Sequence, residues 1–376
     1  MERLSEELLD HIVSEVIKPL PNRHGLLYDD LLNLSMVSRK FCRIVEPHIY
    51  HSLVVSVSNK NKLSRILDDR PELLRYIRAV FVMRYHGFAN KPENFVMRVP
   101  NLEKLDLDIT RFPVSEIVPL LKLRTVKSLR LSGVAVAGFP ISQRHRAYWE
   151  FDNDTLACLD ISLTSPGHPW ELLDGLKVFA AVFRSLTRLQ IHTNYEKIRY
   201  HALNGSVFRY TVCAFKHAFQ ATLRDFSFEN HDTNGPYLYE EEEAMGEYCD
   251  FSAILRDSQL EKLKIDTICL HKPGQKTKLR SLELGPSCLP SSLRILYMRH
   301  DVATGNLNPI EKNLMHADEA QCLSQLMNLA ARRSRFTSLQ QLTLVISVPR
   351  FFEEVASRVV KVQARRVKVP LDLMFM

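Results

Sequence analysis

The stretch Leu102-Glu103-Lys104-Leu105-Asp106-Leu107 carries the pattern that decides the fold, an apolar residue followed three and five positions later by two more. The alternation at its end is typical of a short β-strand with one buried face, and the first apolar residue anchors the turn before the strand. Because such a strand cannot bury its apolar face alone, the pattern predicts neighbouring strands of the same kind.

The same pattern recurs along most of the chain. Its ten matches are Ile77/Val80/Val82, Leu102/Leu105/Leu107, Val126/Leu129/Leu131, Leu156/Leu159/Ile161, Leu186/Leu189/Ile191, Leu223/Phe226/Phe228, Leu260/Leu263/Ile265, Leu279/Leu282/Leu284, Leu293/Leu296/Met298 and Leu339/Leu342/Leu344. Most intervals leave room for a returning helix, and amphipathic stretches at Trp170–Arg184, Val207–Thr222 and Glu319–Arg333 are candidates. The two short intervals on either side of Leu279 predict a return through a loop. We expect stacked strands, with an ordinary α/β domain as the alternative.

This repeat resembles a leucine-rich-repeat solenoid with irregular repeat lengths. The asparagine that the family places three residues after the last anchor occurs once, at Asn194, so the resemblance implies an array without the usual asparagine ladder. The residues between anchors project from the exposed, often concave face, which is either a binding surface or a solvated strand face. From this face we predict a set of substrate-binding residues: Arg130, Arg188, His192, Lys262, Lys264, Tyr297 and Arg299.

The first 50 residues follow a different pattern, with apolar residues at helical spacing. Ser5 is placed to cap a first helix, Pro19 to end it, and Asp29 or Asp30 to cap a second helix that runs through Phe41. So few short helices cannot bury this much apolar surface among themselves. We expect them to dock, either as a cap on the repeat array or onto another protein.

Two segments of this region, LSEELLDHI (residues 4–12) and DLLNLSMVSRKF (residues 30–41), resemble an F-box, and Ile49–Val55 resembles the strand that follows it in fungal members. The resemblance implies an α/β chain with a small all-α F-box module at 1–56 and an irregular leucine-rich-repeat solenoid at 57–376. It also implies that the module binds a Skp-type adaptor and so joins a cullin–RING (SCF) ubiquitin ligase, while the solenoid binds a protein substrate. The residues implied in adaptor docking, or in the small core beneath it, are Leu4, Leu8, Leu9, Ile12, Leu31, Leu32, Leu34, Val37 and Phe41.

Composition places the chain among ordinary globular proteins, with 45% hydrophobic and 25% charged residues in a length of 376. The longest apolar runs are too short to span a bilayer, and the N-terminus lacks the apolar core of a signal peptide, so we expect no membrane contact. The seven cysteines are scattered and include no CxxC pair. This argues against a disulfide framework and a zinc ribbon, and it favours a reducing compartment, cytoplasmic and/or nuclear.

Catalytic signatures are absent from the sequence: it contains no P-loop, GxSxG, HExxH, EF-hand or Rossmann pattern. We therefore expect neither an enzyme nor a cofactor or metal, since partner proteins would transfer the ubiquitin. An F-box-like scaffold that acts outside the ligase is one alternative. Another is a basic nucleic-acid-binding solenoid, which the net charge of +7 is too small to identify. Its basic clusters, such as Arg144/Arg146 and Lys361–Lys368, are spread over separate segments.

Overall fold

The computed structural model describes residues 5–17, 24–83, 96–109, 118–135, 151–165, 169–193, 203–230, 251–266, 289–301, 338–347 and 371–375. Within them, eleven strands form one sheet in chain order, and each strand pairs in parallel with the next. The strands are β1 (Ser52–Val55), β2 (Ala79–Val82), β3 (Lys104–Asp108), β4 (Ser128–Ala135), β5 (Cys158–Ser165), β6 (Arg188–Thr193), β7 (Asp225–Asn230), β8 (Lys262–Asp266), β9 (Ile295–Asp301), β10 (Gln341–Ser347) and β11 (Leu371–Phe375). The protein is a mixed α/β chain built on a parallel sheet.

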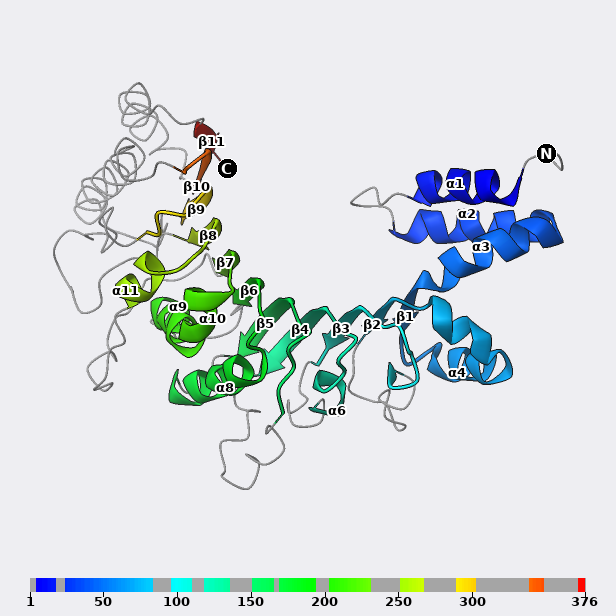
Figure 1. The fold of residues 1–376 in the computed structure, drawn as a ribbon, viewed down its shortest axis with the longest axis horizontal. Helices are drawn as coiled ribbons and strands as arrows, with labels where there is room; N and C mark the ends of the chain where they lie inside the picture. The colour runs from blue at the N-terminus through cyan, green and yellow to red at the C-terminus, as the bar shows by residue number, and fades with distance from the viewer. Residues whose placement is uncertain are drawn as a thin grey trace, which may run out of the picture.

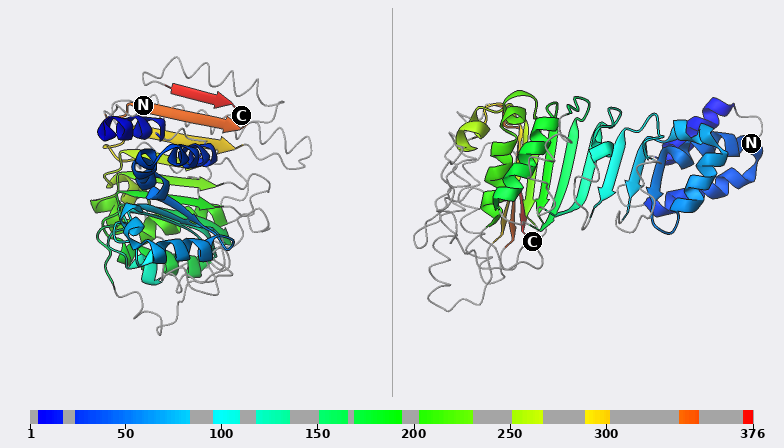
Figure 2. Two further views of the ribbon diagram at one scale, coloured as in Figure 1. Left: turned by 90° about the vertical axis from the view of Figure 1, so that its right-hand side faces the viewer. Right: turned by 90° about the horizontal axis from the view of Figure 1, so that it is seen from below.

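The sheet bends into an arc, with the strands on its inner side and the returning helices on its outer side (Figure 1). Three helices precede the sheet, α1 (Glu6–Ile17), α2 (His24–Val37) and α3 (Arg39–His51), and Figure 2 shows them beyond β1 at one end of the array. The outer elements are α4 (Lys60–Asp69), the 3-10 helix η1 (Pro71–Tyr76), α6 (Val118–Leu121), α8 (Pro169–Val182), α9 (Leu203–Ala214), α10 (Lys216–Ala221) and α11 (Phe251–Arg256).

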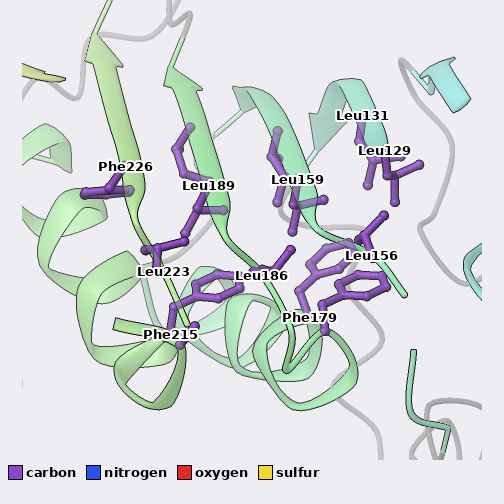
Figure 3. Packing of buried hydrophobic residues seen from close by; sticks show 14 of the residues in the cluster. Leu129, Leu131, Leu156, Leu159, Phe179, Leu186, Leu189, Phe215, Leu223 and Phe226 are labelled. Carbon is purple, nitrogen blue, oxygen red and sulfur yellow. The ribbon is translucent and has the colours of Figure 1, made fainter. Parts of the chain in front are cut away.

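Apolar residues stack in rows across the strands because the register keeps equivalent anchors side by side. Leu159 on β5 pairs with Leu129 on β4 and Leu189 on β6, and Leu189 pairs with Phe226 on β7. Rings from the outer helices pack beneath these rows (Figure 3), and the Phe219 and Phe226 rings meet edge to face with centroids 5.0 Å apart. Fully burying one such side chain stabilises the fold by about 1.5–3 kcal/mol.

The repeated pattern predicts most of the sheet. Nine of its ten matches coincide with strands β2 to β10, and the tenth, at Leu279/Leu282/Leu284, lies outside the described residues. However, β8 pairs directly with β9, which leaves no place between them for a strand around Leu282. The expectation of two short repeats there is wrong. The first anchors of the two neighbouring repeats, Leu260 and Leu293, are 33 residues apart, similar to the other intervals.

A ladder of forked backbone hydrogen bonds joins the turns that lead into the strands. The carbonyl of Arg78 accepts from the N–H groups of Glu103 at 2.8 Å and Lys104 at 2.9 Å, and the carbonyl of Glu103 accepts likewise from Lys127 and Ser128. The same fork repeats at each turn as far as the start of β10. We call the eight residues whose carbonyls accept these pairs the rim: Arg78, Glu103, Lys127, Ala157, Thr187, Arg224, Glu261 and Arg294. The rim aligns successive repeats where an asparagine ladder is missing from the sequence.

One buried asparagine adds a side-chain link between repeats. Asn153 is 3% exposed, and its Nδ2 donates to the carbonyls of Leu121 at 2.9 Å and Leu123 at 3.3 Å. Its Oδ1 accepts from the N–H groups of Thr155 and Leu156, both at 3.2 Å. The side chain thereby ties the turn before β5 to the turn that follows α6, and its polar atoms are satisfied in an apolar setting.

The N-terminal helices differ from the predicted pair at their boundaries. Ser5 does cap α1, since its Oγ accepts from the N–H of Leu8 at 3.2 Å. The second helix, however, begins at His24, so Asp29 and Asp30 lie inside it and do not cap it. It also ends at Val37, because Ser38 is extended and its Oγ accepts from the N–H of Phe41 at 3.2 Å, which starts α3. Pro19 lies outside the described residues.

The three N-terminal helices have a small core of their own, separate from the core of the sheet. It contains Leu9, Val13, Leu31, Phe41, Ile44, Val45 and Ile49. Tyr50 packs against both cores, and α3 ends at His51, where β1 begins immediately at Ser52. The strand foreseen at the end of the N-terminal module therefore pairs with β2 and buries Leu53 and Val55 in the sheet core.

Two details of the α9–α10 region differ from expectation. The helix predicted over Val207–Thr222 is two helices, with Phe215 between them, whereas the helix predicted at Trp170–Arg184 is found as α8. Cys213 is disulfide-bonded, with a partner outside the described residues. The scatter of the cysteines did not predict this bond, because spacing along the sequence does not show which cysteines the fold brings together.

Candidate protein-interaction surfaces

Helices α1 and α2 leave a set of large apolar side chains uncovered. The exposed fractions are 45% for Leu8, 44% for Ile12, 38% for Leu32, 75% for Met36 and 64% for Val37. Leu8 and Ile12 are four residues apart on α1, as are Leu32 and Met36 on α2, so each pair shares one helix face. Pairs of large exposed apolar side chains on a helix face are typical of a protein-binding surface.

The structure sorts the nine predicted adaptor-docking residues into two groups. Leu8, Ile12, Leu32 and Val37 are exposed. Leu9, Leu31 and Phe41 are buried in the small core, Leu34 packs against it, and Leu4 lies outside the described residues. Met36, the most exposed of the set, was not among the predicted residues, although its place four residues after Leu32 indicates the same helix face.

Polar contacts hold α1 against α3. Nη2 of Arg43 lies 2.8 Å from Oε1 of Glu6, and Nε2 of His48 lies 2.9 Å from Oδ1 of Asp10. These contacts bind one side of α1, while Leu9 and Val13 fill the core. The apolar pair Leu8 and Ile12 stays exposed.

A second candidate surface is the inner face of the sheet, where a chain of charges crosses neighbouring strands. Arg130 on β4 stands between two carboxylates, with its Nη1 3.9 Å from Oδ2 of Asp106 on β3 and its Nε 3.4 Å from Oδ2 of Asp160 on β5. Nε2 of His192 on β6 is 3.3 Å from Oδ1 of Asp160. Four adjacent strands are thus linked through their outward side chains.

The chain of charges continues to β9. Nδ1 of His192 lies 3.8 Å from Oε2 of Glu229 on β7, and Nζ of Lys264 on β8 lies 2.7 Å from Oε1 of the same carboxylate. Lys264 also lies over the ring of Tyr297 on β9, 4.8 Å from its centroid. The face therefore presents a connected polar surface rather than isolated solvated residues.

The predicted substrate-binding residues divide accordingly. Arg130, His192, Lys264 and Tyr297 belong to one connected set. Two others lie outside this set: Nε of Arg188 lies 3.7 Å from Oδ2 of Asp225, and Lys262 is exposed at the start of β8. Arg299 is half-buried on β9. The acids Asp106, Asp160 and Glu229 were not selected from the sequence, because their pairing with the cations follows from register alone.

The acids of this network lie deeper than the cations. The side chains of Asp106, Asp160 and Glu229 are 18–21% exposed, against 50% for Arg130 and 41% for Lys264. Burial raises the pKa of Asp106. Burial acts in the same direction on Glu229, but the hydrogen bond and charge of Lys264, together with His192, outweigh it and lower the pKa of that carboxyl. Guanidinium and ammonium groups thus form the outer layer.

Neither a metal-ion site nor a membrane-spanning helix is found in the part of the chain that the structure describes. No three His, Cys, Asp or Glu side chains among those residues are placed to hold a metal ion. None of the described helices is long and apolar enough to cross a membrane. No family model and no curated protein matches the chain.

Proposed function

We propose that this protein is the substrate-recognition subunit of an SCF-type cullin–RING ubiquitin ligase, an F-box module followed by a leucine-rich-repeat-like solenoid. In this role α1 and α2 bind a Skp-type adaptor, and the inner face of the arc binds the protein to be ubiquitinated. Other subunits carry out the transfer chemistry, so the chain itself needs no catalytic group.

The observation that carries the proposal is the exposure of Leu8, Ile12, Leu32, Met36 and Val37 beside a small core that is already complete. Had these residues served only to cap the repeat array, they would be covered by it. Instead the array has its own core, and the cap contact is made through α3 and Tyr50. The uncovered apolar set therefore supports docking of a separate protein.

A capture experiment tests the proposal. The full chain is mixed with a purified Skp-type adaptor, beside a Leu8→Asp/Val37→Asp variant. Both side chains are exposed, so the variant should fold, which circular dichroism checks. The matched control is Val57→Asp/Met97→Asp, which alters two apolar residues of similar exposure, 51% and 49%, outside the N-terminal helices.

Capture of the wild type and of the control, but not of the Leu8/Val37 variant, is the expected result. A folded wild-type chain that fails to capture the adaptor would overturn the proposal and leave the N-terminal helices as a cap. Adaptor capture without ubiquitination of any protein bound by the arc, in a reconstituted ligase, would favour a scaffold that acts outside the ligase.

A further inference from the structure

Positive charge is concentrated along one edge of the inner face, at the strand beginnings. This edge comprises the rim and the first outward residue of each strand, and we call it the rim band. Its cations are Arg78, Lys104, Lys127, Arg188, Arg224, Lys262 and Arg294, and its carboxylates are Glu103, Asp225 and Glu261. Seven cations against three carboxylates leave an excess of four positive charges.

The remainder of the described inner face has the opposite balance. Its cations are Arg130, Lys264 and Arg299, and its carboxylates are Asp106, Asp108, Asp160 and Glu229. The face is therefore polarised along the strand direction, basic where the strands begin and slightly acidic further along. A partner that is drawn to the basic edge is also positioned by the acidic one.

Three cations of the rim band form no ion pair with a carboxylate among the described residues. One of them, Arg224, donates instead to the carbonyls of Leu223 and Gln259. Lys104 is exposed and its Nζ lies over the ring of Phe81, 5.4 Å from the centroid, while Lys262 is exposed at the start of β8. One rim carboxylate also serves two cations, because Arg78 and Lys127 both lie 3.7 Å from Glu103. Charge is thus left unneutralised at β3, β4 and β8.

We propose that the rim band binds an acidic, extended peptide segment of the partner protein, which lies across the strand beginnings from β3 to β8. Five strand spacings make this distance about 24 Å, the length of about seven extended residues. On one side of an extended chain, side chains recur every ~7 Å, so such a segment presents about four carboxylates. Within this span five cations, Lys104, Lys127, Arg188, Arg224 and Lys262, are available to such a segment. The inference rests on the proposed function because it names the substrate class for the same arc.

A nucleic acid fits this band less well. Duplex DNA carries about one charge per 1.7 Å, so roughly fourteen phosphate charges would fall within the same length. Glu103, Asp225 and Glu261 stand among the cations and would repel so dense a backbone. A peptide with spaced carboxylates can meet the lysines and arginines and leave the three acids facing its neutral residues.

The test uses two labelled octapeptides, alternating Glu-Ser and alternating Lys-Ser, with the full-length chain in low salt and fluorescence anisotropy as the readout. The variant is Lys104→Glu/Lys262→Glu, which reverses the two exposed cations that form no ion pair. The matched control is Lys62→Glu/Lys216→Glu, an equal charge change at exposed positions of the outer helices α4 and α10.

The wild type is expected to bind the acidic peptide and not the basic one, with affinity reduced about tenfold or more in the Lys104/Lys262 variant and within about twofold in the control. Absence of saturable binding by the folded wild type, or an equal loss in the control, overturns the inference. An eight-nucleotide oligothymidylate that binds more tightly than the peptide, and loses affinity in the same variant, would replace it with nucleic-acid binding.

Adaptor capture by the Lys104/Lys262 variant separates this inference from the proposed function. Both lysines lie in the sheet, outside the adaptor-docking helices, so capture should be unchanged. A wild type that captures the adaptor but fails to bind the peptide refutes only the rim-band inference. A wild type that binds the peptide but captures no adaptor refutes only the ligase role.

Discussion

Nζ of Lys264 lies 2.7 Å from Oε1 of Glu229 on the neighbouring strand and, at the same time, 4.8 Å from the centroid of the Tyr297 ring on the strand beyond. One ammonium thus connects three strands of the inner face. The contact with Glu229 also reverses the effect of burial on that carboxyl, whose pKa lies below its ordinary value.

Replacing this lysine should shift the titration of Glu229. In Lys264→Met, burial is opposed only by the weaker influences of His192 and Ser227, so the pKa of Glu229 should rise. Because the native pKa is depressed, the carboxylate stabilises the fold above its ordinary pKa, and this contribution is lost as the pH falls through the lower folded value. The Lys264→Met variant should lose this contribution to stability. NMR titration of the Glu229 carboxyl carbon measures the shift.

The matched control for this titration is Lys262→Met, on the same strand. Its ammonium has no carboxylate partner among the described residues, so Glu229 should titrate as in the wild type. At neutral pH the Lys264 variant should be about 1 kcal/mol less stable at most, since the ammonium is partly exposed. An unchanged Glu229 pKa in Lys264→Met would show that the contact is not maintained in solution.

Asn153→Ala should destabilise the protein by about 3 kcal/mol. The substitution leaves the carbonyl of Leu121 and the N–H of Leu156 without their partners in a buried site. Urea unfolding measures the loss. Asn101→Ala is the control, because Asn101 makes a single more exposed bond to the carbonyl of Arg75, and it should cost less than about 1 kcal/mol. Equal losses would contradict the role of Asn153 as a link between repeats.

Phe226→Ala should cost about 3–5 kcal/mol, because the ring is fully buried and packs edge to face on Phe219. Phe226→Leu should cost much less, since a leucine keeps most of the apolar volume and matches its neighbour in the row, Leu189. Thermal or urea unfolding compares the two. A large loss in both would mean that the ring geometry, and not the buried volume, holds this part of the core.

Ser38→Ala should cost about 1 kcal/mol, since it removes the cap at the start of α3. Ser38→Asp should retain most of the stability, because its carboxylate can accept the same N–H and suits the helix N-terminus. Circular dichroism melts measure both. If alanine and aspartate behave alike, the helix break at this point depends on packing and not on the cap.

The spacing of the anchors was enough to predict β2 to β10, because a buried strand end demands apolar residues at fixed positions. The same logic failed for residues 279–284, since the pattern is short and also arises by chance, and only strand pairing shows that β8 and β9 are neighbours. The helix break at Ser38 was missed for a different reason. A serine is compatible with both a helix interior and a cap, and its backbone conformation decides between them.

The candidate surfaces were predictable to different degrees. Helical spacing placed Leu8, Ile12 and Leu32 on apolar helix faces, but it did not separate these exposed residues from the buried Leu9 and Leu31, because that depends on how α1 and α2 pack on α3. The chain of charges on the inner face was harder to predict from the sequence. Glu229 and Lys264 are far apart in sequence, and they meet only because the register brings β7 and β8 together.

The forked bonds of the rim involve backbone atoms alone. The shape of the arc therefore does not depend on which side chains stand at its edge. The eight rim positions already hold five residue types, Arg, Glu, Lys, Ala and Thr, with the same hydrogen bonds throughout. Proline is excluded at all eight, since each also donates its N–H and proline has none. Single substitutions can therefore change the charge of this edge while the backbone hydrogen bonds, and with them the fold, stay the same. The rim is a place where new binding preferences can evolve at little structural risk.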